Sequence, residues 1–404
     1  MTQTTKSSGP HASDPTVSVV ISTHNRANYL AETFESLFAQ THPVTEIIVV
    51  NDASTDETAD VLARFSDRIT VVNLATNQGK AGALNTIIPE ARGEFLWIFD
   101  DDDVALPDAL ARHLALIRAH PDTDFTFSSA YHTSDPESIW NRSAWHANTL
   151  ADIPPEAFLI ETLRSMNTPM QGMLISRQAV LDIGMFDTDM FRCQDLDLLI
   201  RLGAKYRGRQ LDSPSFVYRE HARARGGGQK THSAKDRFQI SDRYRKQVFR
   251  KLRNILPLDS YLQHLPADHG LFPAAARDPA ALIQRATVFM RQGLVSDALV
   301  DFDHAFGDPN ARSIDTGWIA DNLSTATDVE PWMFESRRAV VQGLANVLAR
   351  HGQHALARAV VRGLFWSMRR ELQGRRSRQA GTAGLMLVGF AASYVPYRLR
   401  SRAS

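Results

Sequence analysis

Cysteine is almost absent from this chain, since Cys193 is the only one in 404 residues. A single thiol excludes an internal disulfide and a cysteine-rich zinc site, and it favours a reducing, cytoplasmic environment. Long apolar runs are also absent. The nearest candidate, residues 383–397, is 15 residues long and therefore too short for a transmembrane helix. Residues 1–15 are polar and lack the apolar core of a signal peptide, so we expect a disordered lead-in.

Net charge is absent as well, because 45 lysines and arginines balance 45 acidic residues. The balance is uneven along the chain. Residues 331–404 contain 13 arginines, no lysine and two acidic residues, a net charge of +11, which leaves −11 on residues 1–330. This distribution excludes a uniformly basic nucleic-acid-binding protein. The remaining composition, 43% hydrophobic and 22% charged, is typical of globular domains, and the length allows two or three of them.

Short apolar runs alternate with helical patterns in the first half of the chain. The runs expected to form strands are residues 17–22, 46–50, 69–73, 95–99, 125–129, 172–176 and 215–221. Helical spacing appears between them, for example over residues 29–40, from about 77 to 91, and over 195–204. This alternation predicts right-handed βαβ units and a mostly parallel sheet.

Polar segments follow three of the predicted strands, at residues 23–26, 51–54 and 100–103. In a parallel sheet the carboxyl ends of the strands meet at one edge, so these segments are expected to share one crevice. Asp100–Asp103 are four consecutive carboxylates, which raise one another's pKa unless a cation neutralises them. A divalent cation, Mn²⁺ or Mg²⁺, suits such oxygen ligands. The alternative interpretation is a solvated acidic loop.

The second half of the chain has a helical pattern. We place the boundary in the glycine-rich segment near residue 230, so that residues 16–230 form an α/β domain and residues 231–404 a helical region. Residues 286–305 and 345–364 share a spacing of small and apolar residues around a glycine, which resembles tetratricopeptide hairpins. The two copies lie 59 residues apart rather than about 34, so an ordinary helical bundle is favoured.

Four segments and a proline resemble the family 2 glycosyltransferases of the GT-A fold, in family order and spacing. They are VSVVISTHNRANYL, EIIVVNDASTDET, NQGKAGALN, ARGEFLWIFDDDD and Pro107. The resemblance covers residues 16 to about 221. It implies a Rossmann-like, mostly parallel sheet flanked by helices, here followed by an α-helical C-terminal region. It also implies an inverting, metal-dependent transfer of a sugar from a nucleotide-sugar to a hydroxyl acceptor, in cell-surface glycan or polysaccharide synthesis.

The resemblance also assigns roles to individual residues. Nucleotide-sugar binding is assigned to Thr23, Asn25, Arg26, Asp52, Lys80, Asp100 and Asp101. Pro107 sets the register of the Asp-x-Asp motif, so Asp102 is the implied metal ligand and Asp103 assists it. His221 is a second implied ligand, with a surface histidine as the alternative. Asp195, in a segment resembling Glu-Asp-x-Asp, is the implied catalytic base. The alternative is a structural role, in which Asp195 is the N-cap of the helix that runs to residue 204. Asp197 is expected to support the fold.

The chemistry of several side chains fits these assignments. Asp52 can accept a hydrogen bond from the imide N–H of uracil, so a UDP-sugar is the favoured donor, with GDP and dTDP open. Asn77, Gly79 and Lys80 open a helix whose N-terminal amides and cation suit an anion. Asn85 has two equally weighted roles, a donor contact or a bond to a neighbouring loop. The acceptor, a glycan or a lipid-linked molecule, is expected to contact residues 170–173 and variable loops such as 131–153.

The C-terminal tail is basic on both sides of its short apolar segment. Arginines bracket the apolar segment at positions 369, 370, 375, 376, 378, 398, 400 and 402. Residues 366–404 are therefore expected to rest on an anionic membrane surface at its cytoplasmic face, and a terminal helix docked on the protein is the alternative.

Two other functions are alternatives to glycosyl transfer. A sugar nucleotidyltransferase is disfavoured because the segment after the first strand, STHNRANYL, contains no glycine and so lacks a glycine-rich phosphate-binding loop. An inactive transferase-like scaffold is the other alternative.

Overall fold

The computed structural model describes residues 15–133, 135, 137–148, 150–166, 168–220, 234–266, 268–327, 337–373, 384–391 and 393–394. The chain divides into two compact units, Met1–Tyr244 and Arg245–Ser404. The domain boundary expected near residue 230 falls in residues 221–233, which lie outside the described residues.

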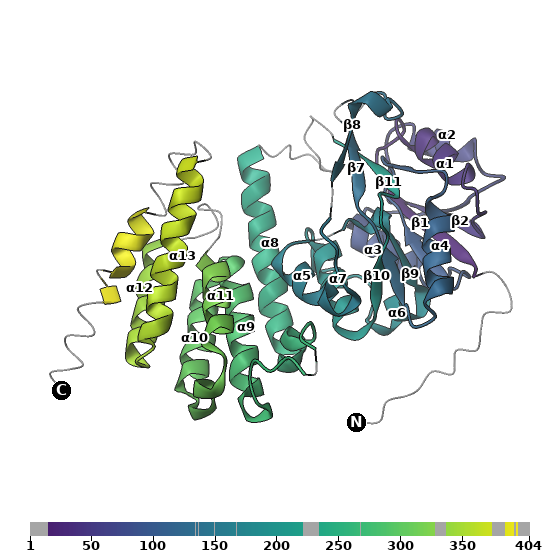
Figure 1. Ribbon diagram of the computed structural model, residues 1–404. Helices are drawn as coiled ribbons and strands as arrows, with labels where there is room; N and C mark the ends of the chain where they lie inside the picture. The colour runs from purple at the N-terminus through teal and green to yellow at the C-terminus, as the bar shows by residue number, and fades with distance from the viewer. Residues whose placement is uncertain are drawn as a thin grey trace. The chain divides into compact units, whose positions relative to one another are not determined.

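The first unit is built around a seven-stranded sheet with the order β10-β6-β9-β4-β1-β2-β3 (Figure 1). In this order the strands are Gly208–Gln210, Phe125–Phe127, Met173–Ser176, Phe95–Ile98, Val17–Thr23, Glu46–Asn51 and Thr70–Asn73. β1 pairs in parallel with β2 and β4, whereas β9 runs antiparallel between β4 and β6. The predicted mostly parallel sheet is therefore confirmed.

Both faces of this sheet are buried, which explains why its strands are continuous apolar runs in the sequence. Successive side chains of a strand point to opposite faces. Val19 and Ile21 of β1 therefore pack on one side, and Val20 packs on the other. The helices on the first side are α1 (Leu30–Phe38), α2 (Thr58–Ala63) and α4 (Ala109–Ala119). Those on the second side are α3 (Gly79–Ile87), α5 (Phe158–Arg164), α6 (Arg177–Asp182) and α7 (Gln194–Lys205).

A second sheet of four short strands has the order β5-β11-β7-β8. Its strands are Val104–Ala105, Phe216–Arg219, Ala130–Thr133 and Trp145–Asn148. β5 begins directly after the acidic run 100–103 and pairs antiparallel with β11. The loop expected over residues 131–153 instead contains most of β7 and all of β8, because cross-strand pairing organises residues whose own pattern is polar.

The second unit is helical, as predicted. Its helices are α9 (Arg277–Arg291), α10 (Val295–Gly307), α11 (Thr316–Thr327), α12 (Arg337–Arg350) and α13 (His354–Gln373), followed by a helix at residues 384–391. α8 (Ala234–Ile255) extends across the boundary between the units. Short 3-10 segments in the two units cover Arg142–Ala144, Pro155–Ala157, Met170–Gly172, Leu258–Leu262, Ala274–Ala276 and Pro309–Ser313.

The shared spacing in the second half corresponds to two helix hairpins, α9–α10 and α12–α13. Gly293 and Gly352 turn the chain with φ of 75° and 65°, a left-handed conformation that glycine adopts without a steric penalty. Close helix packing also requires a small residue at Gly343, where a β-carbon would lie 2.2 Å from the Leu299 side chain. α11 separates the two hairpins in the chain, as in a bundle rather than a regular repeat array.

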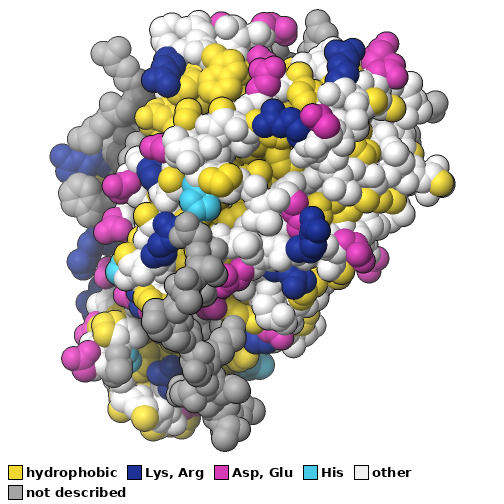
Figure 2. Space-filling model, turned by 90° about the vertical axis from the view of Figure 1, so that its right-hand side faces the viewer, with side chains coloured by type: hydrophobic (Ala, Val, Ile, Leu, Met, Phe, Trp, Pro, Cys, Tyr) yellow, Lys and Arg dark blue, Asp and Glu magenta, His cyan; other side chains and the backbone are white. Residues whose placement is uncertain are grey.

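The apolar segment near the C-terminus is only partly packed. In the helix at residues 384–391, Met386 and Phe390 are 7% and 1% exposed, whereas Leu385 and Val388 are 75% and 67% exposed. Among the described residues, no helix has the length and apolar character needed to cross a membrane. Most of the bracketing arginines lie in residues 374–383 and 395–404, outside the described residues. On the face shown in Figure 2, basic and acidic side chains are interspersed.

Candidate functional site

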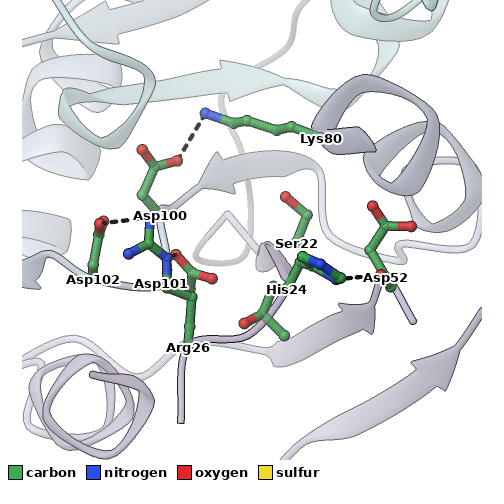
Figure 3. Close-up of a pocket in the computed structure, with 9 residues that line it drawn as sticks. Ser22, His24, Arg26, Asp52, Lys80, Asp100, Asp101 and Asp102 are labelled. Atoms are coloured by element: carbon green, nitrogen blue, oxygen red, sulfur yellow. Dashed lines mark hydrogen bonds and ion pairs between the residues drawn. The ribbon is translucent and has the colours of Figure 1, made fainter. Parts of the chain in front are cut away.

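A pocket of about 210 Å³ lies at the carboxyl ends of β1, β2 and β4 (Figure 3). The strand order places β2 and β4 on either side of β1, which is where an open α/β sheet binds ligands. The lining residues are Ser22, Thr23, His24, Arg26, Asp52, Lys80, Asp100, Asp101 and Asp102. The three polar segments that follow these strands in the sequence therefore meet in one place.

The four carboxylates after β4 are held differently from one another. Asp103 is fully buried, and its two oxygens accept hydrogen bonds from the Arg219 backbone N–H at 2.8 Å and from Gln171 Nε2 at 2.6 Å. The same Gln171 nitrogen donates to Asp100 Oδ2 at 2.6 Å, and Lys80 Nζ donates to Asp100 Oδ1 at 2.8 Å. Both oxygens of Asp100 and of Asp103 are thus occupied by protein donors.

Arg219 is the second support of the acidic run. Its side chain is 1% exposed, and its Nε donates to the backbone oxygen of Asp102 at 2.8 Å. The guanidinium also donates to Glu32 Oε2 at 2.5 Å and lies over the ring of Tyr29, 4.9 Å from its centre. A buried guanidinium needs such partners because its charge cannot be solvated. The arrangement fixes the backbone that presents Asp102.

Asp101 and Asp102 face Arg26 (Figure 3). Arg26 Nε lies 3.7 Å from Asp101 Oδ1, and its Nη2 lies 3.6 Å from Asp102 Oδ2, so both are ion pairs longer than a hydrogen bond. Burial, followed by the charge of Asp102, raises the pKa of Asp101 to about 7, although Arg26 opposes the shift. Burial also raises the pKa of Asp100. This end of the run carries more negative charge than its protein partners neutralise.

Lys80 connects the acidic run to Asp195. Its Nζ lies 2.8 Å from Asp100 Oδ1 and 3.4 Å from Asp195 Oδ2. Burial lowers the pKa of Lys80, but the two carboxylates outweigh it and the net shift is upward. The lysine is therefore charged when it holds these groups together. Asp100 and Asp195, which are 95 positions apart in the chain, share this one cation.

Asp195 lies in the first turn of α7. Its alternative role as the N-cap is wrong, because the N-cap is Cys193, which has a φ of 61°. Asp195 Oδ1 is buried and has no hydrogen-bond partner among the described residues, whereas Oδ2 faces Lys80. Asp197 points elsewhere and pairs with Arg201 at 2.6 Å, so its predicted structural role agrees with its position.

Asp52 is oriented by the start of α3. Its two carboxylate oxygens accept hydrogen bonds from the backbone N–H groups of Gln78 at 2.7 Å and Gly79 at 2.9 Å. The sequence led us to expect that the amides at the start of this helix bind an anion. In the structure, the anionic group that they bind is the carboxylate of Asp52. The His24 ring contacts the backbone oxygen of Asp52 at 2.7 Å, which ties the ends of β1 and β2 together.

Other predicted residues have different surroundings. Asn25 does not line the pocket; its Oδ1 accepts a hydrogen bond from the Thr55 backbone N–H at 2.8 Å, in a loop where Asn25 has a φ of 55°. Asn85 makes the loop bond rather than a pocket contact, since it exchanges two hydrogen bonds with the Phe186 backbone. Residues 170–173 are buried. His221 lies outside the described residues.

The donor set fits a hard divalent cation. Asp100, Asp102 and Asp103 each present an oxygen within 4.8 Å of the others, and all three are carboxylates, which Mg²⁺ and Mn²⁺ prefer over imidazole or thiolate. Asp100 and Asp103 accept two protein hydrogen bonds each, and Asp102 Oδ2 lies 3.6 Å from Arg26 Nη2. The three carboxylates together form the oxygen-rich set that such a cation requires.

Comparison with known proteins identifies the family. The model described as Glycosyl transferase family 2 matches residues 18–183. The uncharacterised glycosyltransferase YwdF of Bacillus subtilis (strain 168) is 31% identical over 204 residues, which are 50% of this chain and 73% of that protein. This chain belongs to glycosyltransferase family 2. The predicted family and enzyme class are confirmed, and a sugar nucleotidyltransferase is excluded as its family.

The alignments with two other relatives of this family 2 glycosyltransferase cover a smaller share of those proteins. The uncharacterised glycosyltransferase RP339 of Rickettsia prowazekii (strain Madrid E) is 28% identical, and the alignment spans 46% of this chain and 57% of that protein. The putative teichuronic acid biosynthesis glycosyltransferase TuaG of Bacillus subtilis (strain 168) is 38% identical over 25% of this chain and 41% of its own. The chain thus spans about half the length of these two relatives.

Solved structures give weaker similarities. S. aureus TarS 1-349 in complex with UDP-GlcNAc has a TM-score of 0.49 at 16% identity, covering 96% of this chain and 92% of the TarS 1-349 chain. The mannosyltransferase PcManGT from Pyrobaculum calidifontis, in complex with GDP-Man and Mn²⁺, has a TM-score of 0.42 at 17% identity, covering 95% and 88%. The family assignment rests on the sequence relatives.

The sequence did not predict that Gln171 and Arg219 hold the acidic run. Gln171 reaches the acidic run because β9 lies beside β4, and Arg219 reaches it because β11 pairs with β5. Neither pairing follows from local residue patterns. Arg219 has one weak indication, namely a charged residue at the end of an apolar strand, two positions before the histidine predicted as a ligand.

The raised pKa of Asp101 predicts a pH-dependent stability. In the metal-free protein, the folded state keeps the Asp101 proton up to about pH 7, whereas the unfolded state loses it near the ordinary value of 3.8. The folded state therefore binds more protons between these values. The free energy of unfolding should decrease as pH rises through this window, by up to about 1.4 kcal/mol per pH unit. Urea unfolding with chelator at several pH values measures it.

Asp101→Asn should lose much of this pH dependence, because an amide does not titrate. Asp189→Asn, which changes an exposed carboxylate, should keep it. Equal slopes in wild type and Asp101→Asn would show that the carboxyl group is not perturbed.

Proposed function

We propose that this chain is a metal-dependent, inverting glycosyltransferase that moves a sugar from a UDP-sugar to a hydroxyl group of a glycan or lipid-linked acceptor, in cell-surface glycan or polysaccharide synthesis. The observation that carries the proposal is the position of Lys80. Its ammonium group joins Asp195, the candidate base, to Asp100 of the acidic run. The candidate base for the acceptor hydroxyl group and the carboxylates proposed to hold the cation of the donor diphosphate therefore both lie within reach of the Lys80 side chain.

Donor recognition is assigned to the residues that line the pocket. Asp52 is held by two backbone amides, and each carboxylate oxygen retains a further lone pair that can accept the imide N–H of uracil. Thr23 offers a hydroxyl group to the nucleotide, and Arg26 offers a cation to the diphosphate. Asn25 supports the proposal indirectly, because it holds the loop that carries Arg26.

The acidic run is assigned to the divalent cation. Asp102 would bind it directly, Asp100 and Asp103 would contribute oxygens nearby, and His221 remains a proposed further ligand. A bound Mn²⁺ or Mg²⁺ stabilises negative charge on a departing diphosphate. Asp101 pairs with Arg26 here and is assigned to the donor rather than the metal. Gln171 and Arg219 position the run without touching the substrate.

Asp195 is assigned the proton transfer. The Oδ1 atom, which has no protein partner among the described residues, accepts the proton of the acceptor hydroxyl group. The resulting oxygen nucleophile forms a bond to the anomeric carbon while the bond from that carbon to the diphosphate oxygen breaks on the opposite face. The configuration inverts and the nucleoside diphosphate leaves. Lys80 Nζ lies 3.4 Å from Asp195 Oδ2 and holds the carboxylate in place.

Replacing Asp195 should separate catalysis from donor binding. Asp195→Asn keeps the size of the side chain but removes the base, so kcat should fall about 10²- to 10⁴-fold. The affinity for UDP should stay within about twofold, since the nucleotide pocket is intact. Asp189→Asn is the matched control, because it changes an exposed carboxylate six positions earlier. Unchanged turnover in Asp195→Asn would refute the assignment of the base.

Replacing Asp102 should remove metal-dependent nucleotide binding. In wild type, UDP with Mn²⁺ should raise the melting temperature, and UDP with chelator should do so weakly. Asp102→Ala should lose the Mn²⁺-dependent part, and Asp52→Ala should weaken UDP binding under both conditions. An inactive scaffold predicts no metal-dependent UDP binding in wild type, so the same measurement separates the two functions.

The C-terminal helix supports a location at the membrane surface. Leu385 and Val388 form a small exposed apolar face, and the basic C-terminal region supplies positive charge for anionic lipids. Met386 and Phe390 pack inward, so the helix would contact the membrane through one side only. These features support the proposal that the enzyme is a peripheral protein at the cytoplasmic face of the membrane.

Vesicle binding tests this location. Leu385→Ser with Val388→Ser should weaken binding to vesicles that contain anionic lipid by about tenfold or more, because each buried methylene contributes about 0.8 kcal/mol. Val300→Ser removes an exposed apolar side chain elsewhere in the second unit and should have no effect. Equal sedimentation of both variants with vesicles would assign the helix to the alternative, a docked terminal element.

A further inference from the structure

Two histidines and a glutamate meet on one face of the small sheet. His132 of β7 and His146 of β8 are directly opposite each other in the antiparallel pair. On the other side of β7, Tyr218 of β11 is the register partner of His132. Glu220 follows two residues later, and because side chains two apart in an extended chain share a face, it joins the same surface. None of the three lines the nucleotide pocket.

The distances among these side chains are those of a ligand set. His132 Nδ1 lies 2.9 Å from Glu220 Oε1, and His146 Nε2 lies 3.9 Å from the same oxygen. One ligand atom from each residue falls within 4.8 Å of the other two. Tetrahedral zinc bonds of about 2.0–2.2 Å place ligand atoms about 3.3–3.6 Å apart, so small side-chain rotations suffice to bind a metal.

The two imidazoles also stack at an angle, with centres 5.6 Å apart, which holds both rings beside the carboxylate. The side chains of His132, His146 and Glu220 are 24%, 58% and 49% exposed, so a metal can enter from solvent. A site that keeps solvent access retains an open fourth position, as three-ligand zinc sites do.

We propose that His132, His146 and Glu220 form a second metal site, which takes Zn²⁺ or another imidazole-preferring divalent ion. Its chemistry differs from that of the acidic run, where all ligands are oxygens that suit Mg²⁺ and Mn²⁺. The two sites therefore select different ions from the same solution. This site stands independently of the glycosyl transfer proposed above.

The topology indicates what a metal would do there. β8 is an edge strand, paired only with β7 among the described strands, and β11 lies on the other side of β7. A bound ion would be coordinated by His146 of β8, His132 of β7 and Glu220 directly after β11, and would therefore cross-link the three strands. Glu220 follows Arg219, whose backbone N–H supports Asp103. The metal would thus fasten the edge of the sheet next to the element that holds the acidic run.

Cobalt and zinc titrations of the tag-free full chain test the proposal. Co²⁺ reports coordination by its visible absorption, which is strong in four-coordinate sites and weak in six-coordinate ones. The titration is done in Asp102→Ala and, independently, in wild type with excess Mg²⁺, so that the acidic run does not contribute. We expect one equivalent of Co²⁺ with a strong spectrum, displaced by Zn²⁺ and retained in excess Mg²⁺.

Variants assign the ligands. His132→Ala and His146→Ala should each weaken Zn²⁺ binding more than about 100-fold, since residues outside the ligand shell alone account for 10- to 100-fold. Glu220→Gln should also weaken it. His304→Ala, an exposed histidine of the second unit, should not. Zn²⁺ should slow amide hydrogen exchange in β8 of wild type but not of His146→Ala.

Three results would overturn the site. They are a weak, six-coordinate Co²⁺ spectrum, a stoichiometry unchanged in both histidine variants, and Zn²⁺ binding that is lost equally in His304→Ala. Each can occur while UDP binding and transfer persist, so failure here is distinct from failure of the transferase proposal.

Discussion

Four consecutive carboxylates at the end of β4 have to lie side by side at the edge of a buried sheet, and much of the polar structure around them serves that constraint. Burial and mutual repulsion raise the pKa of Asp100 and Asp101. Gln171, Arg219 and Lys80 compensate, each from a different element. Without these donors and cations, the loop would have to leave the sheet to be solvated, and the pocket would be lost.

The compensation is uneven, and this unevenness has chemical consequences. Asp100 and Asp103 are bound through both oxygens by protein donors, and Asp101 and Asp102 form longer ion pairs with Arg26 in the pocket lining. The pocket lining thus brings three carboxylates of the acidic run beside Arg26 and Lys80, so that a divalent cation could balance the carboxylates and the two basic side chains could attract a diphosphate. Lys80 extends the same charge network to Asp195, so that α7 and the acidic run are electrostatically linked.

The family match and the site do not have the same extent. The family model ends at residue 183, yet α7 supplies Asp195 and β11 supplies Arg219. These later elements return to the acidic run through Lys80 and Asp103. Family membership is carried by the first strands and their loops, whereas the completed pocket needs residues up to about 220. Helix α7 and strand β11 of the four-stranded sheet make this return.

Local patterns in the sequence determined the α/β class, most strands, the helical second half and the three polar segments of the pocket, because strand periodicity and polar strand ends are properties of neighbouring residues. They also indicated the bond of Asn85 to a loop as one of two roles. Only the tertiary structure decided that the helix amides bind Asp52, that Gln171 and Arg219 hold the acidic run, and that His132, His146 and Glu220 meet. These contacts join residues 14 to 117 positions apart, and such pairings depend on strand order and register, which no local pattern encodes.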